Sequence, residues 1–159
     1  MFNVNDIVVC GNNGICRIET IEKKSIMNQA KQFYVMVPVV THDATLRTKI
    51  MLATDTLKPM RYLKSKEEVI ADLVALSKSE YYDEKDYKKR EKYYKEVINS
   101  IDVFSYPNIL KTIYSDNVFS SSTDRLYIEV IKRICNEEIS YVLSIEDTEV
   151  ESYISKYIN

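Results

Sequence analysis

The sequence predicts an α+β protein in which a small barrel or strongly twisted sheet precedes a bundle of about five helices. Short runs rich in Val and Ile, separated by turn residues, fill the chain up to about residue 62. From about residue 66 the apolar residues recur at helical spacing instead. Between the two patterns, LKPMRYL contains Pro59, which interrupts a strand ladder. We therefore expect two domains, residues 1–64 and residues 65–159.

Both glycines of the chain, Gly11 and Gly14, lie in the stretch VVCGNNGICRI. Glycine enters left-handed backbone conformations that a β-carbon makes costly, and asparagine tolerates them better than most residues. Gly-Asn-Asn-Gly is therefore expected to form the turn of a β-hairpin. Further strands are expected in KQFYVMVPVV and RTKIMLATD, with breaks at MNQAK and THDAT.

Five helices are expected in the second half. Ser65 and Glu68 fit a capping box, in which two side chains satisfy free amides of the first turn. The other helices are expected from Asp83 or Asp86 to Asn99, and over 107–114, 123–142 and 145–157, with Pro107 in a first turn and Ser122 and Ser144 as caps. The predicted apolar faces are Val69, Ile70, Leu73 and Leu76 in the first helix, and Leu126, Val130, Ile131, Ile134, Cys135 and Ile139 in the fourth.

The composition favours a soluble, cytoplasmic protein without a membrane segment. No apolar run approaches 20 residues, and the first residues lack a basic start followed by a long apolar segment. The three cysteines, Cys10, Cys16 and Cys135, are expected to be reduced, although the first two could face each other across the hairpin. The single histidine, His42, is far in sequence from all of them, so we expect neither a metal site nor a cofactor.

The sequence shows no pattern typical of an enzyme. It has no phosphate-binding glycine loop and no nucleophile elbow. A single histidine without an identifiable partner makes a Ser-His-Asp or Cys-His site improbable. We therefore expect no catalytic activity and no small-molecule substrate.

The segment DEKDYKKREKYYKEVINS, residues 83–100, concentrates positive charge and aromatic rings. Lysine and arginine neutralise phosphates while an aromatic ring meets a base step, as in minor-groove and single-strand binders. The alternative is an amphipathic helix whose lysines only face solvent. In that alternative, Tyr87, Tyr94, Val97 and Ile98 pack inward.

The order of these features resembles the CarD/CdnL family of bacterial transcription regulators. MFNVNDIVVCGNNGICRIETIE is similar to the family's opening, F-x-x-G-D-x-V-V-Y-P-x-H-G-V-G-x-I-x-x-I-E. QFYVMVP and TKIMLATD resemble its next strands, and DYKKREKYYKEVINSIDVF resembles N-W-x-R-R-Y-x-x-x-x-x-K-L-x-S-G-D-x-F. The departures are Asn5, Cys10, Gly11 and Asn13 in the opening, LATD after Met51, Tyr87 in place of tryptophan, and Lys89 with Arg90 in place of two arginines.

The resemblance implies a non-enzymatic regulator with a Tudor- or SH3-like barrel that binds the β subunit of RNA polymerase. The family shares this domain with the transcription-repair coupling factor. By the resemblance, Lys24, Ile26 and Met51 align with the polymerase-facing surface, where strand-edge pairing between two sheets is expected. On their own, Ile26 and Met51 are equally consistent with barrel core, and Lys24 with an ordinary exposed lysine.

The resemblance also implies that the helical domain contacts promoter DNA at the upstream edge of the melted region. An aromatic wedge in the minor groove would stabilise the open complex without reading a specific sequence. The residues carried over to that role are Tyr87, Lys88, Lys89, Arg90 and Lys92. The alternative function is a protein-interaction module that docks on polymerase or another partner without touching DNA, which the acidic final third of the chain favours.

Overall fold

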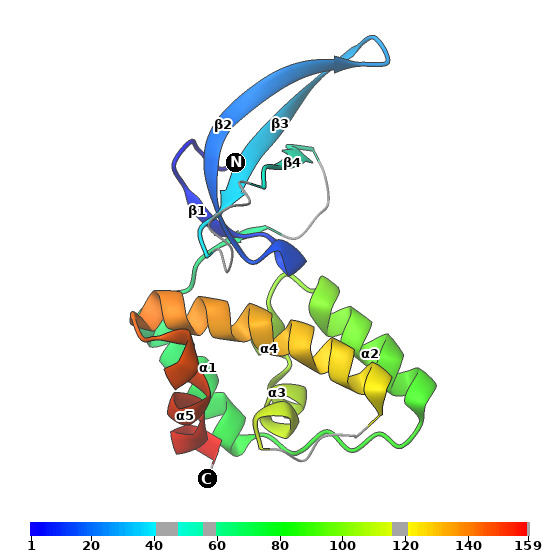
Figure 1. The fold of residues 1–159 in the computed structure, drawn as a ribbon, viewed down its shortest axis with the longest axis vertical. Helices are drawn as coiled ribbons and strands as arrows, with labels where there is room; N and C mark the ends of the chain where they lie inside the picture. Colours follow the sequence, from blue (N-terminus) through cyan, green and yellow to red (C-terminus); the bar gives the residue numbers. More distant parts are fainter. Residues whose placement is uncertain (41–47, 56–59, 116–120, 159) are drawn as a thin grey trace. The chain divides into compact units, whose positions relative to one another are not determined.

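Strands precede helices in the computed structural model, which describes residues 1–40, 48–55, 60–115 and 121–158 (Figure 1). The predicted α+β class is confirmed, with an antiparallel sheet followed by five α-helices. The chain divides into two units, Met1–Leu63 and Lys64–Asn159, and each has its own hydrophobic core. His42, Pro59 and the predicted THDAT break lie outside the described residues.

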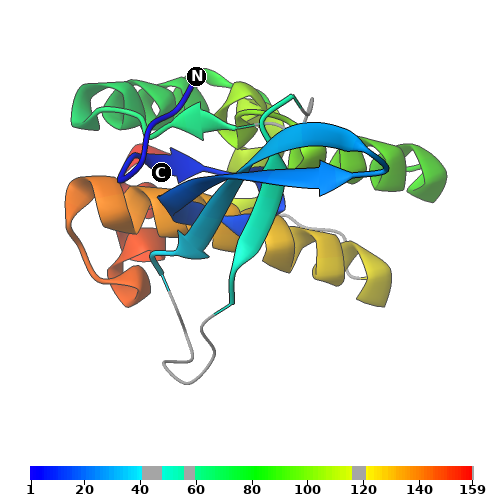
Figure 2. The same cartoon turned by 90° about the horizontal axis from the view of Figure 1, so that it is seen from above.

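The N-terminal unit is one five-stranded sheet with the order β4-β3-β2-β1-β5. Neighbouring strands are antiparallel, and within the described residues β4 and β5 end the sheet without pairing to each other. A register shift between Ile18 and Thr20 interrupts the β2–β3 ladder, and such a bulge bends and twists a strand. The bend is visible in Figures 1 and 2. The strands are β1 (Ile7–Val9), β2 (Ile15–Ile26), β3 (Gln29–Pro38), β4 (Ile50–Ala53) and β5 (Arg61–Tyr62).

The predicted Gly-Asn-Asn-Gly turn joins β1 to β2. Both Gly11 and Gly14 have positive φ, 47° and 70°, so the two glycines lie where the turn requires them. The amide of Cys10 donates to the Gly14 carbonyl at 2.9 Å and closes the turn. The β2–β3 turn places Met27 and Asn28 at positive φ, as the two central residues of a type I′ hairpin require.

The inward face of the sheet forms a small core of its own. Val8, Cys16, Ile18 and Met36 are fully buried there. Cys10, Tyr34 and Leu52 complete the cluster. Two of the three cysteines are therefore small apolar components of this core.

Five helices form the second unit: α1 (Lys66–Lys78), α2 (Tyr87–Asn99), α3 (Pro107–Tyr114), α4 (Ser122–Leu143) and α5 (Asp147–Ile158). Pro107 opens α3 as predicted. Two predicted caps are wrong. Ser121, not Ser122, caps α4, and Ser144 ends α4 in a left-handed conformation instead of starting the last helix. The predicted faces are buried except for Ile70 and Leu126, which are exposed, and for Val130, which is partly buried.

The predicted capping box of α1 is confirmed. Ser65 Oγ accepts from the Glu68 amide at 3.2 Å, and Glu68 Oε2 accepts from the Ser65 amide at 2.7 Å. Because loss of an N-cap oxygen leaves a first-turn amide unsatisfied, we expect Ser65→Ala to lower the free energy of unfolding by about 1 kcal/mol. Urea denaturation would measure the change, with Ser77→Ala on the exposed face of the same helix as the control. Equal effects of the two substitutions would contradict the prediction.

Candidate protein and nucleic-acid interfaces

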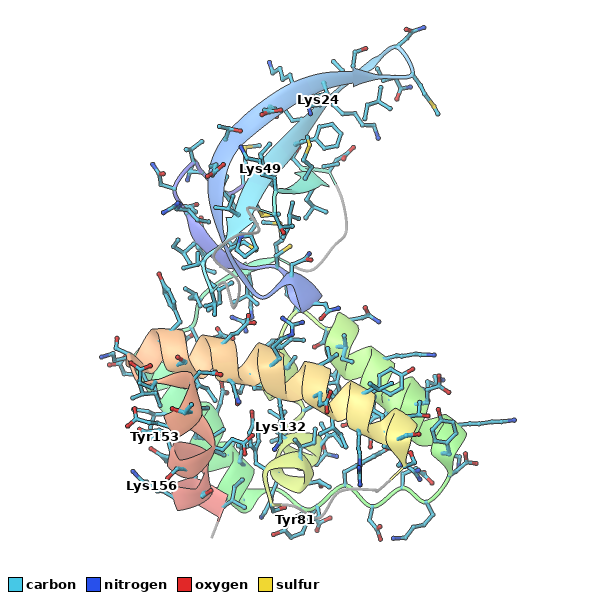
Figure 3. All side chains as sticks on the ribbon, viewed as in Figure 1. Lys24, Lys49, Tyr81, Lys132, Tyr153 and Lys156 are labelled. Atoms are coloured by element: carbon cyan, nitrogen blue, oxygen red, sulfur yellow. The ribbon has the colours of Figure 1, made fainter. Side chains whose placement is uncertain are left out.

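Lys24 and Met51 lie far apart in the sequence but touch in the folded sheet. Lys24 on β2 places its Nζ 3.4 Å from Met51 Sδ on β4, and 3.5 Å from a carboxylate oxygen of Glu22. Figure 3 shows Lys24 on the long hairpin. A thioether is a weak acceptor, so this contact mainly brings a cation and an apolar side chain together.

Strand register places Ile26 on the same side as this pair. Ile26 follows Lys24 by two positions on β2, and Met51 pairs with Val35 of β3. Side chains alternate across a strand, so these residues point away from the core face that carries Tyr34. We call Lys24, Ile26 and Met51 the outer-face cluster.

The outer-face cluster is accessible. Ile26 is 44% exposed and Met51 is 43% exposed, and neither belongs to the core of the sheet. Beyond them, every residue from 23 to 30 is exposed, with Met27 95% exposed at the turn. β4 is also an end strand of the described sheet. The unit therefore offers a mixed basic and apolar face next to a strand edge.

The second candidate surface lies at the start of α2. Asp86 caps the helix, and its carboxylate accepts from the amides of Lys88 and Lys89. Tyr87, the first residue of α2, is 38% exposed, and Lys88, Lys89 and Lys92 are exposed with it. We call these four residues the α2 cluster. The structure therefore brings an aromatic ring and three lysines together at one helix end.

Other lysines near tyrosines in this unit already contact an aromatic ring or a carboxylate. Lys132 lies over the Tyr114 ring and bonds Glu151 at 3.0 Å, and Lys156 lies over the ring of Tyr153 (Figure 3). Among the described residues no ion pair involves Lys88 or Lys92, and Lys89 approaches Glu84 only at 4.0 Å. The α2 cluster therefore has cationic groups available for a partner.

Arg90 was predicted to join these lysines, but its side chain is buried. Its Nε and Nη2 donate to the two Asp124 carboxylate oxygens at 3.1 and 3.0 Å, which is the bidentate geometry of a strong pair. Its Nη1 donates to the backbone carbonyls of Lys85 at 2.8 Å and Glu84 at 3.3 Å. Arg90 therefore joins α2, α4 and the segment before α2.

The charge of Asp124 is stabilised by its neighbours. Burial alone would raise the pKa of this carboxyl, but hydrogen bonds from Arg90 and Ser121 outweigh burial, so the pKa lies below its usual value. Burial, together with the nearby Asp124 carboxylate, raises the pKa of Tyr94 far above its usual value. Asp124 therefore remains ionised against Arg90.

The tyrosines of α2 divide between core and surface. Tyr94 is buried and stacks on Tyr127 with ring centroids 5.6 Å apart, and Tyr93 stacks on Tyr82 at 4.7 Å. The inward packing expected for Tyr94 and Val97 in the amphipathic alternative is observed, while Tyr87 remains exposed.

Sequence reasoning did not identify Asp124. The sequence did contain one indication that Arg90 is buried. Arg90, Tyr94 and Val97 are spaced so that they share one face of a helix, and all three are buried. That face predicts a buried arginine, and a buried arginine requires an acidic partner. The identity of the partner was not predictable, because Asp124 lies 34 residues further along the chain.

The described residues contain no group of three or more His, Cys, Asp or Glu side chains that could hold a metal ion. In the same part of the chain, no helix is both long and apolar enough to cross a membrane.

An open sheet with an accessible basic and apolar face is a type of surface that binds protein partners. Residues 2–63 match the family model described as CarD-like/TRCF RID domain. The predicted resemblance is thus confirmed for the N-terminal unit, which carries a CarD-like/TRCF RID domain, and this domain indicates an RNA polymerase-interacting, transcription-related protein. A search of curated proteins found no match. The similarity of residues 86–104 to the family lies outside the matched range and stays a prediction.

Proposed function

We propose that this chain is a non-enzymatic transcription regulator that binds the RNA polymerase β subunit through its N-terminal unit and promoter DNA through the α2 cluster. The observation that carries the proposal is the CarD-like/TRCF RID match over residues 2–63. The exposed tyrosine and lysines of the α2 cluster support the DNA contact. The domain assignments are therefore polymerase binding for residues 1–64 and DNA binding for residues 65–159.

Polymerase binding is assigned to the outer-face cluster and the edge of β4. A strand of the β subunit would add to β4 through backbone hydrogen bonds, which are independent of side-chain identity. Ile26 and Met51 would then supply apolar contacts beside that edge, and Lys24 a charged contact at the rim. Strand addition sets the orientation, and the side chains set the preference for this partner.

DNA binding is assigned to the α2 cluster, without Arg90. Lys88, Lys89 and Lys92 would neutralise phosphates, and the Tyr87 ring would wedge into the minor groove at the upstream edge of the melted region. Neither contact reads base identity, so the effect would not depend on an operator sequence. A wedge at that edge would oppose closing of the bubble and stabilise the open complex.

Tyrosine makes this wedge weaker than the tryptophan of the family pattern. It has less apolar area, and its hydroxyl requires a partner when water is removed. DNA binding by this chain should therefore depend strongly on its lysines.

The alternative function is a module that docks on protein through both units. It is favoured by the acidic residues next to the α2 cluster, since Asp83, Glu84 and Asp86 precede Tyr87 directly. These carboxylates would repel phosphates and suit a basic protein surface. Binding to promoter DNA separates the two functions, because only phosphate neutralisation gives an affinity for DNA that falls with salt by about 0.9 log–log units for each phosphate contacted.

The test compares the full-length wild type with Tyr87→Ala and with Lys88→Ala/Lys89→Ala/Lys92→Ala. We expect the wild type to bind promoter DNA and prolong the fluorescence-detected open complex of bacterial RNA polymerase, and both variants to lose this effect while still binding polymerase. Removing three phosphate contacts should reduce the log–log salt slope of DNA binding by about 2.7. The matched control is Lys66→Ala/Lys78→Ala/Lys156→Ala, which removes the same charge from exposed positions of the same unit.

The outcomes separate the functions. Loss of the effect in the α2 variants but not in the control supports the DNA contact. If all the proteins bind polymerase and act alike, the helical unit works through protein contacts. If the wild type does not bind polymerase, the proposed function is wrong.

A further inference from the structure

We propose that Arg90 is a positioning residue that holds Tyr87 in place and makes no contact with DNA phosphate. This inference rests on the proposed role of Tyr87 at the DNA. The proposal gives Arg90 a different role from Lys88, Lys89 and Lys92, although these four residues are close together in the sequence. The argument starts from the hydrogen bonds of its guanidinium group.

The guanidinium of Arg90 is occupied on both sides. One side forms the bidentate pair with Asp124, and Nη1 bonds two backbone carbonyls. The side chain of Arg90 is 9% exposed, and that of Asp124 is fully buried. Turning the guanidinium toward a phosphate would leave the Asp124 carboxylate buried without its cation, which is strongly unfavourable.

The same bonds determine where Tyr87 lies. The two carbonyls that accept from Nη1 belong to Glu84 and Lys85, which lie three and two residues before the tyrosine. On the other side, Arg90 is three residues further along α2, and its guanidinium carbon lies 5.8 Å from the centre of the Tyr87 ring. Tyr87 therefore lies at the α2 junction, where the segment before α2 meets its first turn. Arg90 contacts both the segment and the ring of Tyr87.

Asp124 connects this junction to the rest of the unit. It lies in the first turn of α4, where its amide donates to Ser121 Oγ at 3.1 Å and its carboxylate also bonds the Ser121 hydroxyl. Two helix starts are thus joined by one ion pair. Such a support favours an aromatic wedge, because a ring that is already held in place loses less entropy when it inserts.

The test uses Tyr87→Trp as a spectroscopic probe, since the chain contains no other tryptophan. In this background, Arg90→Met/Asp124→Leu removes the ion pair without changing the net charge, and apolar replacement of a buried pair commonly preserves the fold. Arg90→Lys is the second variant. It keeps a cation beside Asp124, but one ammonium group cannot reproduce the fork that also reaches the two carbonyls. The control is Lys132→Met/Glu151→Gln, which removes an ion pair that has no bond to the α2 junction.

Three quantities are measured for each folded protein: tryptophan anisotropy without DNA, DNA affinity, and the salt slope of binding. We expect both Arg90 variants to lower the anisotropy and to weaken DNA binding by about 5- to 150-fold, the range for loss of one stacked base contact. The salt slope should stay unchanged, and the control should match the parent in all three quantities.

A salt slope that falls by about 0.9 with unchanged anisotropy would identify Arg90 as a phosphate contact and overturn the proposal. Unchanged anisotropy and unchanged affinity in a folded variant would overturn it as well. If the anisotropy falls in the Arg90 variants while the parent does not bind DNA, Arg90 does position residue 87, and the proposed DNA contact is the part that fails.

Discussion

Replacing Asp124 by alanine is expected to lower the free energy of unfolding by about 3–5 kcal/mol. The substitution leaves the Arg90 guanidinium buried without its carboxylate, and it removes the anchor between the starts of α2 and α4. A surface ion pair would cost far less, because water replaces the missing partner. Urea denaturation followed by circular dichroism would measure the change.

The matched control for this substitution is Asp147→Ala. Asp147 also lies in the first turn of a helix, α5, but it is exposed. Asp147→Ala should lower the free energy of unfolding by no more than about 1 kcal/mol. Similar losses for the two substitutions would contradict the role assigned to the buried pair.

The pH dependence gives an independent check of the same pair. Because the folded-state pKa of Asp124 is lowered, its contribution to stability is fully present above the unfolded-state pKa. The contribution disappears as the pH falls through the lowered folded-state value. The stability difference between wild type and Asp124→Asn should therefore be constant near neutral pH and should shrink in acid. A difference that grows in acid would contradict the assignment.

Local patterns predicted the elements, and tertiary contacts determined which residues of each pattern are buried and which are exposed. The glycine-flanked turn and the Ser65 capping box were predictable because each is decided within a few residues. The burial of Arg90, which was predicted to contact DNA, depends on its pair with Asp124. No local sequence pattern connects these two residues. The contact of Lys24 with Met51 likewise requires β4 to pair with β3, and strand order is a property of the whole sheet.

The wrong prediction that Leu126 lies on the buried face of α4 also depends on the burial of Asp124. Ile128, Ile131, Cys135 and Ile139 follow one helical face, and Asp124 begins it. Leu126 is two positions from Asp124 and from Ile128, so it lies on the opposite side of the helix and is 64% exposed. The predicted face included Leu126 because leucine is apolar. The buried face begins instead at Asp124, which a pattern of apolar residues does not include.

The outer-face cluster carries the second large expected effect. We expect Ile26→Asp and Met51→Asp each to weaken binding of the full-length chain to RNA polymerase by about 30-fold, and both together by about 1000-fold. Each substitution places a carboxylate on a face that must lose water when polymerase binds. The fold should persist, because both side chains are nearly half exposed and lie outside the core of the sheet.

Biolayer interferometry with immobilised polymerase, at two salt concentrations, would measure these affinities. Val4→Asp is the matched control, since Val4 is an apolar residue of the same unit with 46% exposure and lies outside the outer-face cluster. It should change the affinity by less than about threefold. A double variant that binds as tightly as wild type would show that β4 pairs with polymerase through its backbone alone or that polymerase uses another surface. In contrast, a large loss at both salt concentrations would assign most of the binding energy to apolar contacts, because screening weakens charge pairs far more than buried apolar area.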